Sequence, residues 1–330
     1  MPEIELKTLH LTTPFRIAHG ASSTRQVVRV KEGESTSEAP FVPYYHEDVD
    51  LTLEWLRLPQ GEPPTHAAAL AMDLLRCDQE CRARGVALSS LAPAHLPQKT
   101  GPIPACRSFS IPTDFVDFAE LVRDTARQFR ILKLKLGSGD LDHDRQIIST
   151  ARASAPQARI IADVNGGWCV QDSVRMLADL TAHRLELVEQ PFHHQLGVEA
   201  WQKFHQLRQT SPHAKAIQVF ADESAQTAQD VPRLAPYVDG VNVKLLKCAS
   251  FGGALRMIET ARQHGLGILL GCMIESSLGI TAAAHLAPWA DIADLDGHLY
   301  LSDDDFAGVT FDTEGFLHMP EGPGIGAIPR

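Results

Sequence analysis

Three acidic residues stand at the ends of successive apolar runs in the second half of the sequence. They are Asp163, Glu189 and Asp222. The spacing of one strand plus one helix predicts that all three lie at the same edge of a parallel sheet. Carboxylates pressed together repel one another, and a divalent cation removes that cost. Because no His or Cys shares these positions, the pattern favours an oxygen-ligated Mg²⁺ over Zn²⁺.

Lysines stand on both sides of this acidic group along the chain. ILKLKLG (131–137) places Lys133 and Lys135 on one face of a strand, and Lys244 ends a later strand. A substrate carboxylate held by the cation would then have a lysine on each face of its α-carbon. We predict that Lys135 and Lys244 move a proton at that carbon, while Lys133 lowers the pKa of Lys135. The alternative interpretation is a salt-bridge network between these lysines and the three acids.

The elements that position these residues alternate between short apolar strands and longer helices from about residue 107 onward. Nearly continuous Ile, Val and Leu in each run is typical of a parallel sheet covered by helices. Eight strands in roughly 200 residues favour a closed barrel over an open doubly wound sheet. The turn after the first strand, SIPTDF, also lacks the glycines of a nucleotide-binding sheet. The predicted strands are RSFSI (107–111), ILKLKLG (131–137), RIIADVN (159–165), LELVEQP (185–191), IQVFADES (217–224), GVNVKL (240–245), GILLGCM (267–273) and DIADLDG (291–297).

The first hundred residues follow a different pattern. IELKTLHL (4–11) and RQVVRVKEG (25–33) alternate like antiparallel strands with one solvated face, and residues 65–85 predict a helix. Four prolines in residues 91–104 predict a linker into the barrel. The predicted units are an α+β capping domain (1–105, joined by the C-terminal tail 306–330) and the catalytic barrel (106–305).

The composition limits the partners of the chain. It has 330 residues, of which 44% are hydrophobic, and a formal net charge of −11 from 41 acidic and 30 basic side chains. This acidic balance argues against nucleic acid or an anionic membrane as a partner. The start shows no secretory signal, and no apolar run approaches the ~20 residues that span a bilayer. With six scattered cysteines and no CxxC pair, we expect reduced thiols in a cytoplasmic protein.

Together, the motifs resemble the muconate-lactonizing subgroup of the enolase superfamily over nearly the whole chain. They are KLKLG (133–137), ADVNGGW (162–168), VEQP (188–191), ADES (221–224), NVKLLK (242–247) and CMIESSLGITAAAHLA (272–287). The resemblance implies a (β/α)7β barrel, which is a modified TIM barrel, with a smaller α+β N-terminal capping domain. It also implies that the three acids bind Mg²⁺ and that Lys135 and Lys244 form the acid/base pair, assisted by Lys133. It leaves open whether the chain forms a homo-oligomer.

The eighth strand narrows the reaction within this subgroup. DLDGHL puts Asp294 and Asp296 on one face, where two carboxylates call for a cation. The dipeptide epimerases that the chain resembles hold the substrate's α-ammonium group on such an Asp-x-Asp pair. The implied activity is a Mg²⁺-dependent, two-base epimerisation at the α-carbon of the C-terminal residue of a dipeptide. The alternatives are an N-acylamino-acid racemase, an o-succinylbenzoate synthase, a muconate cycloisomerase, or a barrel that only binds a metal or ligand.

The preferred dipeptide depends on positions where the sequence departs from the family. Ala-Glu epimerases carry a basic residue in the loop after the first strand, and His19 aligns with it here, with Arg25 nearby. Ala-Glu is therefore one candidate substrate, and His19, Arg25 and Met273 are predicted to bind the substrate. The first domain is also short around FVPYYHEDVD (41–50), which predicts a different closure over the barrel.

Overall fold

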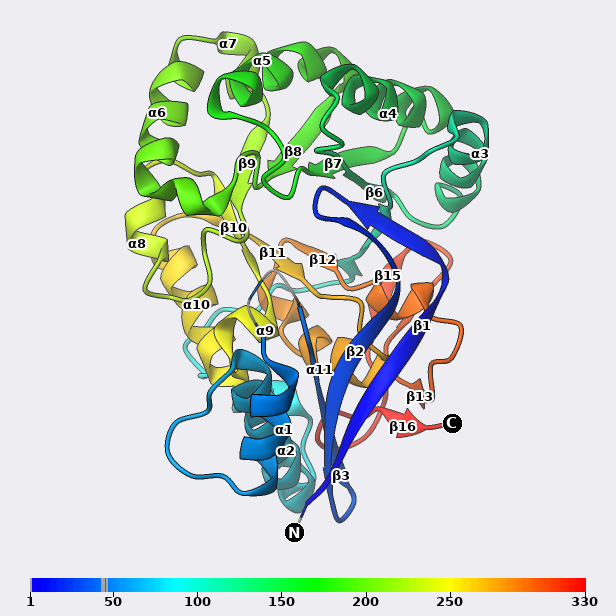
Figure 1. The fold of residues 1–330 in the computed structure, drawn as a ribbon, viewed down its shortest axis with the longest axis vertical. Coiled ribbons are helices and arrows are strands. Elements are labelled where there is room, and N and C mark those ends of the chain that lie inside the picture. The colour runs from blue at the N-terminus through cyan, green and yellow to red at the C-terminus, as the bar shows by residue number, and fades with distance from the viewer. Residues whose placement is uncertain (1, 43–44, 46) are drawn as a thin grey trace.

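The computed structural model describes residues 2–42, 45 and 47–330. Three residues of the segment 41–50, namely Pro43, Tyr44 and His46, lie outside the described residues, so the expected difference in closure stays a prediction. Within the described ranges, none of the helices combines the length and the apolar composition needed to cross a membrane. Figure 1 shows an antiparallel sheet that forms a separate N-terminal domain beside a parallel barrel.

Eight parallel strands form a nearly closed barrel and follow one another around it in sequence order. A parallel bridge between Ala105 and Ala293 joins the two ends of the ring. Every connection between successive strands contains an α-helix, which confirms the predicted (β/α)7β barrel. The strands are β5 (Cys106–Phe109), β6 (Ile131–Lys135), β7 (Arg159–Asp163), β8 (Leu185–Glu189), β9 (Gln218–Ala221), β10 (Gly240–Val243), β11 (Gly267–Gly271) and β12 (Ile292–Asp294). The helices are α3 (Phe115–Thr125), α4 (Leu141–Ser154), α5 (Val170–Leu180), α6 (Gly197–Gln209), α7 (Pro212–Lys215), α8 (Val231–Leu234), α9 (Leu245–Cys248), α10 (Phe251–Gln263) and α11 (Ser277–Ala284).

The interior of the barrel has an apolar floor beneath a polar layer. Successive side chains of a strand point to opposite faces, so every second residue points inward. The floor is a buried cluster of Cys106, Ile131, Ile161, Leu187, Phe220, Leu269 and Ile292. Two positions further along five of these strands stand Lys133, Asp163, Glu189, Asp222 and Asp294. The period of two therefore carries charged side chains to the layer above the floor, toward the carboxyl ends of the strands.

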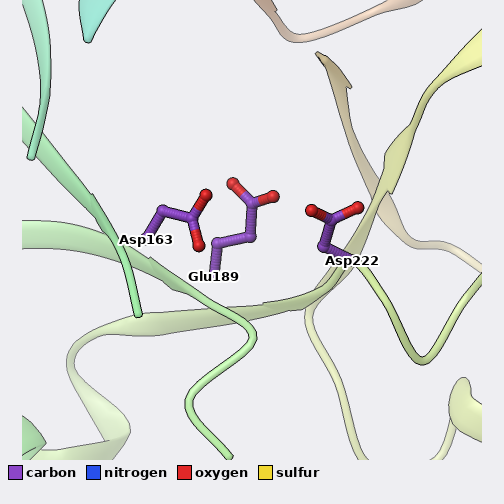
Figure 2. Close-up of side chains that lie close together, drawn as sticks. All are labelled: Asp163, Glu189 and Asp222. Atoms are coloured by element: carbon purple, nitrogen blue, oxygen red, sulfur yellow. The ribbon is translucent and has the colours of Figure 1, made fainter. Parts of the chain in front are cut away.

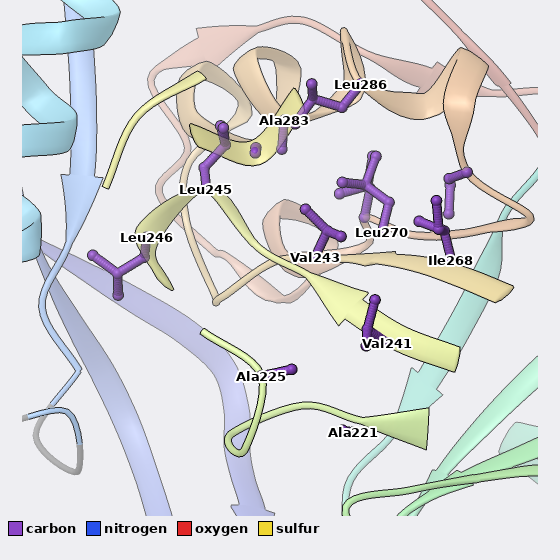
Figure 3. Close-up of a cluster of buried hydrophobic side chains, with 14 of the residues drawn as sticks. Ala221, Ala225, Val241, Val243, Leu245, Leu246, Ile268, Leu270, Ala283 and Leu286 are labelled. Atoms are coloured by element: carbon purple, nitrogen blue, oxygen red, sulfur yellow. The ribbon is translucent and has the colours of Figure 1, made fainter. Parts of the chain in front are cut away.

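A larger core lies between the barrel and its surrounding helices. Figure 3 shows part of it, in which Val241 and Val243 of β10 lie beside Ile268 and Leu270 of β11. All four side chains are fully buried, as is Leu286 just after α11. Replacing a buried Leu or Ile of this kind with Ala typically costs about 2–5 kcal/mol of stability. This packing fixes the strands whose ends carry the polar layer.

The N-terminal domain is an antiparallel sheet packed against two helices. Its strands are β1 (Glu3–Ile17), β2 (Gly20–Glu32) and β3 (Ser35–Pro40), and its helices are α1 (Val49–Arg57) and α2 (His66–Arg84). The side chain of Thr65 caps α2 by accepting a hydrogen bond from the Ala68 backbone N–H, and Gly85 ends the helix in the left-handed region. The strands and the helix predicted for this part of the chain are thus present.

A buried chain of charges joins the N-terminal sheet to the barrel. Arg29 Nε donates to Glu38 Oε2 over 2.8 Å, and the Arg29 guanidinium makes two further bonds to Asp305 at 2.6 and 2.7 Å. The Glu38 carboxylate also accepts from the backbone N–H and the hydroxyl of Ser276, at the start of α11. The bonds to Asp305 and Ser276 therefore tie the sheet to the barrel, while the Arg29–Glu38 pair lies within the sheet itself.

The hairpin of β1 and β2 reaches over the mouth of the barrel (Figure 1). Near its tip, the Arg16 N–H donates to Ser110 Oγ at 2.7 Å, and the Arg16 carbonyl accepts from the Ile111 N–H at 3.0 Å. A Cβ on Gly137 would stand 3.1 Å from the Cβ of Ala18, and the backbone there has a φ of +78°. Glycine at this position therefore allows the hairpin tip to lie close to the loop after β6.

The tail after β12 contacts α2 and the loop that follows it. The Ile325 N–H donates to Asp78 Oδ1 at 2.7 Å, and the Gly324 N–H donates to the Val86 carbonyl at 2.8 Å. The predicted domain boundaries stay a prediction. The short strands of this region are β4 (Ile103–Pro104), β13 (Phe306–Ala307), β14 (Thr310–Phe311), β15 (Phe316–His318) and β16 (Ile328–Pro329).

Candidate active site at the mouth of the barrel

The three acidic residues come together at the carboxyl ends of neighbouring strands. Asp163 and Glu189 are the last residues of β7 and β8 and lie side by side in the sheet register, and Asp222 directly follows β9. All three are fully buried, and one oxygen from each lies within 4.8 Å of the other two. Figure 2 shows the three carboxylates in a row with Glu189 in the middle. This arrangement can hold a metal ion.

The chemistry of the row fits a hard divalent cation. Among the described residues, Glu189 Oε2 is buried without a hydrogen bond, although Lys133 Nζ lies 2.7 Å away in an ion pair. Burial and the neighbouring Asp163 raise the pKa of Glu189 to about 8. A buried carboxylate short of positive charge is costly to ionise, and a bound cation relieves that cost. A site built only from carboxylate oxygens, as here, suits Mg²⁺.

Lys133 lies inside the barrel in contact with this row. Its Nζ is 2.6 Å from Asp294, 2.7 Å from Glu189 and 3.3 Å from Asp163. Burial alone would lower the pKa of Lys133, but these three carboxylates raise it well above its ordinary value. Lys133 is therefore a fixed positive charge. The salt-bridge network, which the sequence left open as an alternative, is present. The three acidic residues also stand at a spacing that suits metal ligands.

Lys135 and Lys244 flank the row from opposite sides, because β6 and β10 stand on either side of β7, β8 and β9. Lys135 Nζ is 2.6 Å from Asp163 Oδ2, and Lys244 Nζ is 2.5 Å from Asp222 Oδ2. Burial would lower the pKa of Lys244, but Asp222 and other nearby acidic groups raise it well above its ordinary value. Each lysine is thus paired with a carboxylate at its own end of the row.

A cavity of about 630 Å³ opens between the barrel and the β1–β2 hairpin. Lys135 and Lys244 both contribute to its wall. The residues predicted to bind substrate also line it; they are Asp294, Asp296, His19, Arg25 and Met273. The barrel and the N-terminal domain therefore enclose the cavity together.

His19 lies in the two-residue turn of the hairpin. Burial and the neighbouring His193 lower the pKa of His19, so its imidazole is neutral at neutral pH. A neutral imidazole offers a substrate carboxylate one hydrogen bond and no full charge. On the β2 side of the hairpin, Arg25 Nη1 donates to the Thr24 carbonyl at 2.8 Å. His19 would therefore bind an acidic substrate side chain more weakly than a permanently charged residue at this position.

Asp294 and Asp296 differ from the expected pair of uncompensated carboxylates. Asp294 is bound to Lys133, and Asp296 Oδ2 lies 3.0 Å from Arg107 Nη1. Ser108 bridges the two, with its hydroxyl 2.9 Å from Asp294 and its N–H 2.7 Å from Asp296. Each carboxylate thus has a cation from the protein itself. Arg107 was missed from the sequence, although a charged residue on a buried strand is the same signal that draws attention to the lysines of β6.

Lys247 was also missed as part of the site. Its fully buried Nζ donates to Asp222 Oδ1 at 2.6 Å and to the carbonyls of Asp222, Ala225 and Asn242 at 2.7–2.9 Å. These bonds hold Asp222 in place and leave its Oδ2 to face Lys244. The only sequence signal was a second lysine in NVKLLK, and three of its four acceptors are backbone carbonyls.

Comparison with known proteins identifies the family. Residues 117–330, about two thirds of the chain, match the family model described as enolase C-terminal domain-like. The chain belongs to this enolase-like family. The predicted resemblance to the enolase superfamily is thereby confirmed.

Other members of the enolase-like family resemble the chain over different lengths. A protein of Bacteroides thetaiotaomicron named L-Ala-D/L-Glu epimerase is 31% identical over 350 residues, which cover 98% of this chain and 86% of that protein. A hydrophobic dipeptide epimerase of a Flavobacteria bacterium is 38% identical over 201 residues, 59% of this chain and 54% of that protein, so the match spans about half of that relative. The structure of a dipeptide epimerase from Cytophaga hutchinsonii, complexed with Mg and D-Ala-L-Val, has a TM-score of 0.88 and 25% identity, covering 100% of this chain and 95% of that one.

Proposed function

We propose that the chain is a Mg²⁺-dependent dipeptide epimerase that inverts the α-carbon of the C-terminal residue. The observation that carries the proposal is the position of Lys135 and Lys244 at opposite ends of one buried carboxylate row, both in the wall of a single cavity. Mere binding of a metal or ligand does not require a lysine at each end. Relatives named dipeptide epimerases support the same activity.

The two lysines act on opposite faces of the substrate α-carbon. One takes the α-proton as its C–H bond breaks, and the other delivers a proton to the opposite face, so the configuration inverts. A divalent cation on Asp163, Glu189 and Asp222 would supply the positive charge that stabilises the substrate carboxylate as the proton leaves. Lys133, held by carboxylates from three strands, adds a permanent positive charge beside the carboxylate row.

The finer features of the proposal rest on the sequence. We propose domain boundaries at residues 105/106 and 305/306. We also propose a cytoplasmic location, because the six free thiols fit a reducing compartment. His19, Arg25 and Met273 are proposed to contact the substrate side chains because they line the cavity. Ala-Glu remains one candidate dipeptide.

The decisive experiment is a dipeptide library incubated with the protein and Mg²⁺ in D₂O. Substrates gain one mass unit at the α-carbon, so mass spectrometry identifies them whichever dipeptide is preferred. Epimerised products are then separated by chiral chromatography. A library in which no dipeptide gains deuterium would overturn the proposal.

A second candidate, an N-acylamino-acid racemase, is favoured by one specific observation. Lys133 and Arg107 already compensate the charges of Asp294 and Asp296, so this end of the cavity does not require a substrate ammonium group. N-acylated amino acids belong in the same D₂O screen. The candidate with the higher kcat/KM identifies the reaction.

A further inference from the structure

Glu223 is a buried acidic residue that the proposed proton transfer does not use. It is only 3% exposed and follows the candidate metal ligand Asp222 in the chain. Its Oε1 accepts a hydrogen bond from Asn165 Nδ2 at 3.1 Å, and no described residue donates a hydrogen bond to its Oε2. Glu223 does not line the cavity, whereas Asn165 and Lys135 do. It therefore lies one layer behind the residues that can touch a substrate.

Asn165 connects Glu223 to Lys135. Its Oδ1 accepts from Lys135 Nζ at 3.3 Å, while its backbone N–H donates to Asp163 Oδ1 at 2.9 Å. The backbone of Asn165 has a φ of +47°, in the left-handed region that asparagine tolerates better than most residues. With its backbone fixed, the remaining freedom of Asn165 is the rotation that exchanges its carbonyl oxygen and amino group.

Glu223 determines which end of that amide faces the lysine. Glu223 Oε1 accepts a hydrogen bond from the Asn165 NH₂ group, and with the amide held this way its oxygen faces Lys135. The opposite orientation would set the NH₂ group against the Lys135 ammonium and the amide oxygen against the carboxylate. Both contacts would then be lost and replaced by unfavourable ones.

We propose that Glu223 is a positioning residue for Lys135 and acts through Asn165. A neutral amine has two N–H groups and one lone pair, and Lys135 Nζ has two fixed acceptors, Asp163 Oδ2 and Asn165 Oδ1. When these acceptors hold two hydrogens, the third tetrahedral position carries the proton that is gained or lost at the substrate. This role rests on the proposed function, because it aligns the base of that reaction.

The other lysine has no such relay. Within the described part of the chain, Lys244 Nζ makes its hydrogen bond to Asp222 and not to an asparagine or glutamine amide. Glu223 acts on Lys244 through its charge alone, whereas it reaches Lys135 through a chain of hydrogen bonds, so disturbing Glu223 should impair deprotonation on the Lys135 side more than on the other. This difference separates positioning from a general effect on folding or on metal binding, because either of those would affect both faces alike.

The test measures the loss of the α-proton from each stereoisomer separately in D₂O by ¹H NMR. Glu223→Met removes the acceptor at similar length, and Glu223→Gln removes the charge while keeping a carbonyl acceptor. The Lys135→Ala variant defines the isomer that Lys135 serves. For that isomer we expect exchange to fall by about 10–100-fold in E223M and by about 3–10-fold in E223Q, since small misplacements of a reacting group cost up to ~10² in rate. For the other isomer we expect less than about a threefold change.

Mg²⁺ titration by calorimetry and the thermal midpoint accompany each variant. We expect both to stay near the wild-type values. Equal losses for both isomers, or unchanged exchange of both in either variant, would overturn the positioning role. If E223M does not fold, the same one-sided criterion applies to E223Q. If the wild-type protein exchanges neither isomer of any dipeptide, the proposed function fails as well, which is a distinct result from equal losses in the variants.

Discussion

Lys135 and Lys244 each contact an acidic residue at opposite ends of one carboxylate row. Lys135 Nζ lies 2.6 Å from Asp163, and Lys244 Nζ lies 2.5 Å from Asp222. The strands that carry them, β6 and β10, are separated by the three strands that carry the acids. Each lysine thus has a carboxylate partner at its own end of the row, and this arrangement suits a reaction that runs both ways.

Replacing either lysine should stop inversion of the α-carbon. One of the two stereoisomers should still exchange its α-hydrogen with solvent. In Lys135→Ala, the isomer whose α-hydrogen faces Lys244 should still exchange in D₂O with retention, because that base remains. Lys244→Ala should give the mirror result with the other isomer. Epimerisation should fall by at least about 10²–10⁴-fold in both variants, measured by chiral chromatography. A variant that exchanges both isomers alike would require a one-base mechanism.

Removing the central charge of the carboxylate row should abolish turnover without unfolding the protein. Glu189→Gln keeps the side-chain volume and removes the negative charge. Among the described residues, Lys133 forms the ion pair with that charge. We expect activity to fall by at least about 10²-fold, the scale on which loss of one electrostatic stabiliser acts. Calorimetry should show weaker Mg²⁺ binding, while circular dichroism stays unchanged. Full wild-type activity in excess EDTA would contradict the metal requirement itself.

The amine end of the cavity should depend on Asp296. Its Oδ2 is occupied by Arg107, Ser108 and Tyr300, so recognition of a substrate ammonium falls to Oδ1. Asp296→Asn should raise KM for dipeptides by about 10–100-fold, the range for loss of a hydrogen bond to a charged group. N-acetylation of the dipeptide should cause a comparable loss in the wild-type protein. Equal kcat/KM for the free and N-acetylated substrates would support the racemase instead.

The joint between the two domains should weaken as the pH falls. Although burial opposes it, hydrogen bonds from Arg29 lower the pKa of Asp305 to about 2, from an ordinary value of 3.8. A carboxylate with a lowered pKa stabilises the folded state above its ordinary pKa and loses this contribution as the pH drops toward its folded pKa. Asp305→Asn should therefore reduce the free energy of unfolding at pH 7. The difference from wild type should shrink between about pH 4 and pH 2, as followed by urea denaturation. Because Asp305 is partly exposed, we expect a modest effect, and a difference that grows on acidification would contradict it.

The sequence was sufficient to predict the barrel and the positions of the candidate site residues because both depend on local periodicity. The period of two on β6 puts Lys133 and Lys135 on the inner face, and the strand-plus-helix spacing brings Asp163 and Glu189 to the same rim. These regularities do not depend on which distant segments meet. The expected positions of the acids and lysines at the rim agree with the structure for that reason.

The groups that surround the reacting residues could not be predicted in this way. Arg107 meets Asp296 only because the first and last strands of the barrel come together, 189 residues apart in the chain. Glu38 meets Ser276 across 238 residues. Lys247 is held mainly by backbone carbonyls, which every residue possesses and no side-chain pattern reveals. The charge balance at Asp294 and Asp296 therefore emerges only from the three-dimensional pairing.

The division of the cavity wall between two parts of the chain has an evolutionary consequence. The candidate lysines and carboxylates lie on or directly after strands of the barrel, whereas His19 and Arg25 belong to the hairpin of the N-terminal sheet. Substitutions in the hairpin can change which substrate side chains fit without altering a strand of the barrel. Proteins that descend from one ancestral gene can therefore diverge in substrate specificity while they keep the same reaction chemistry.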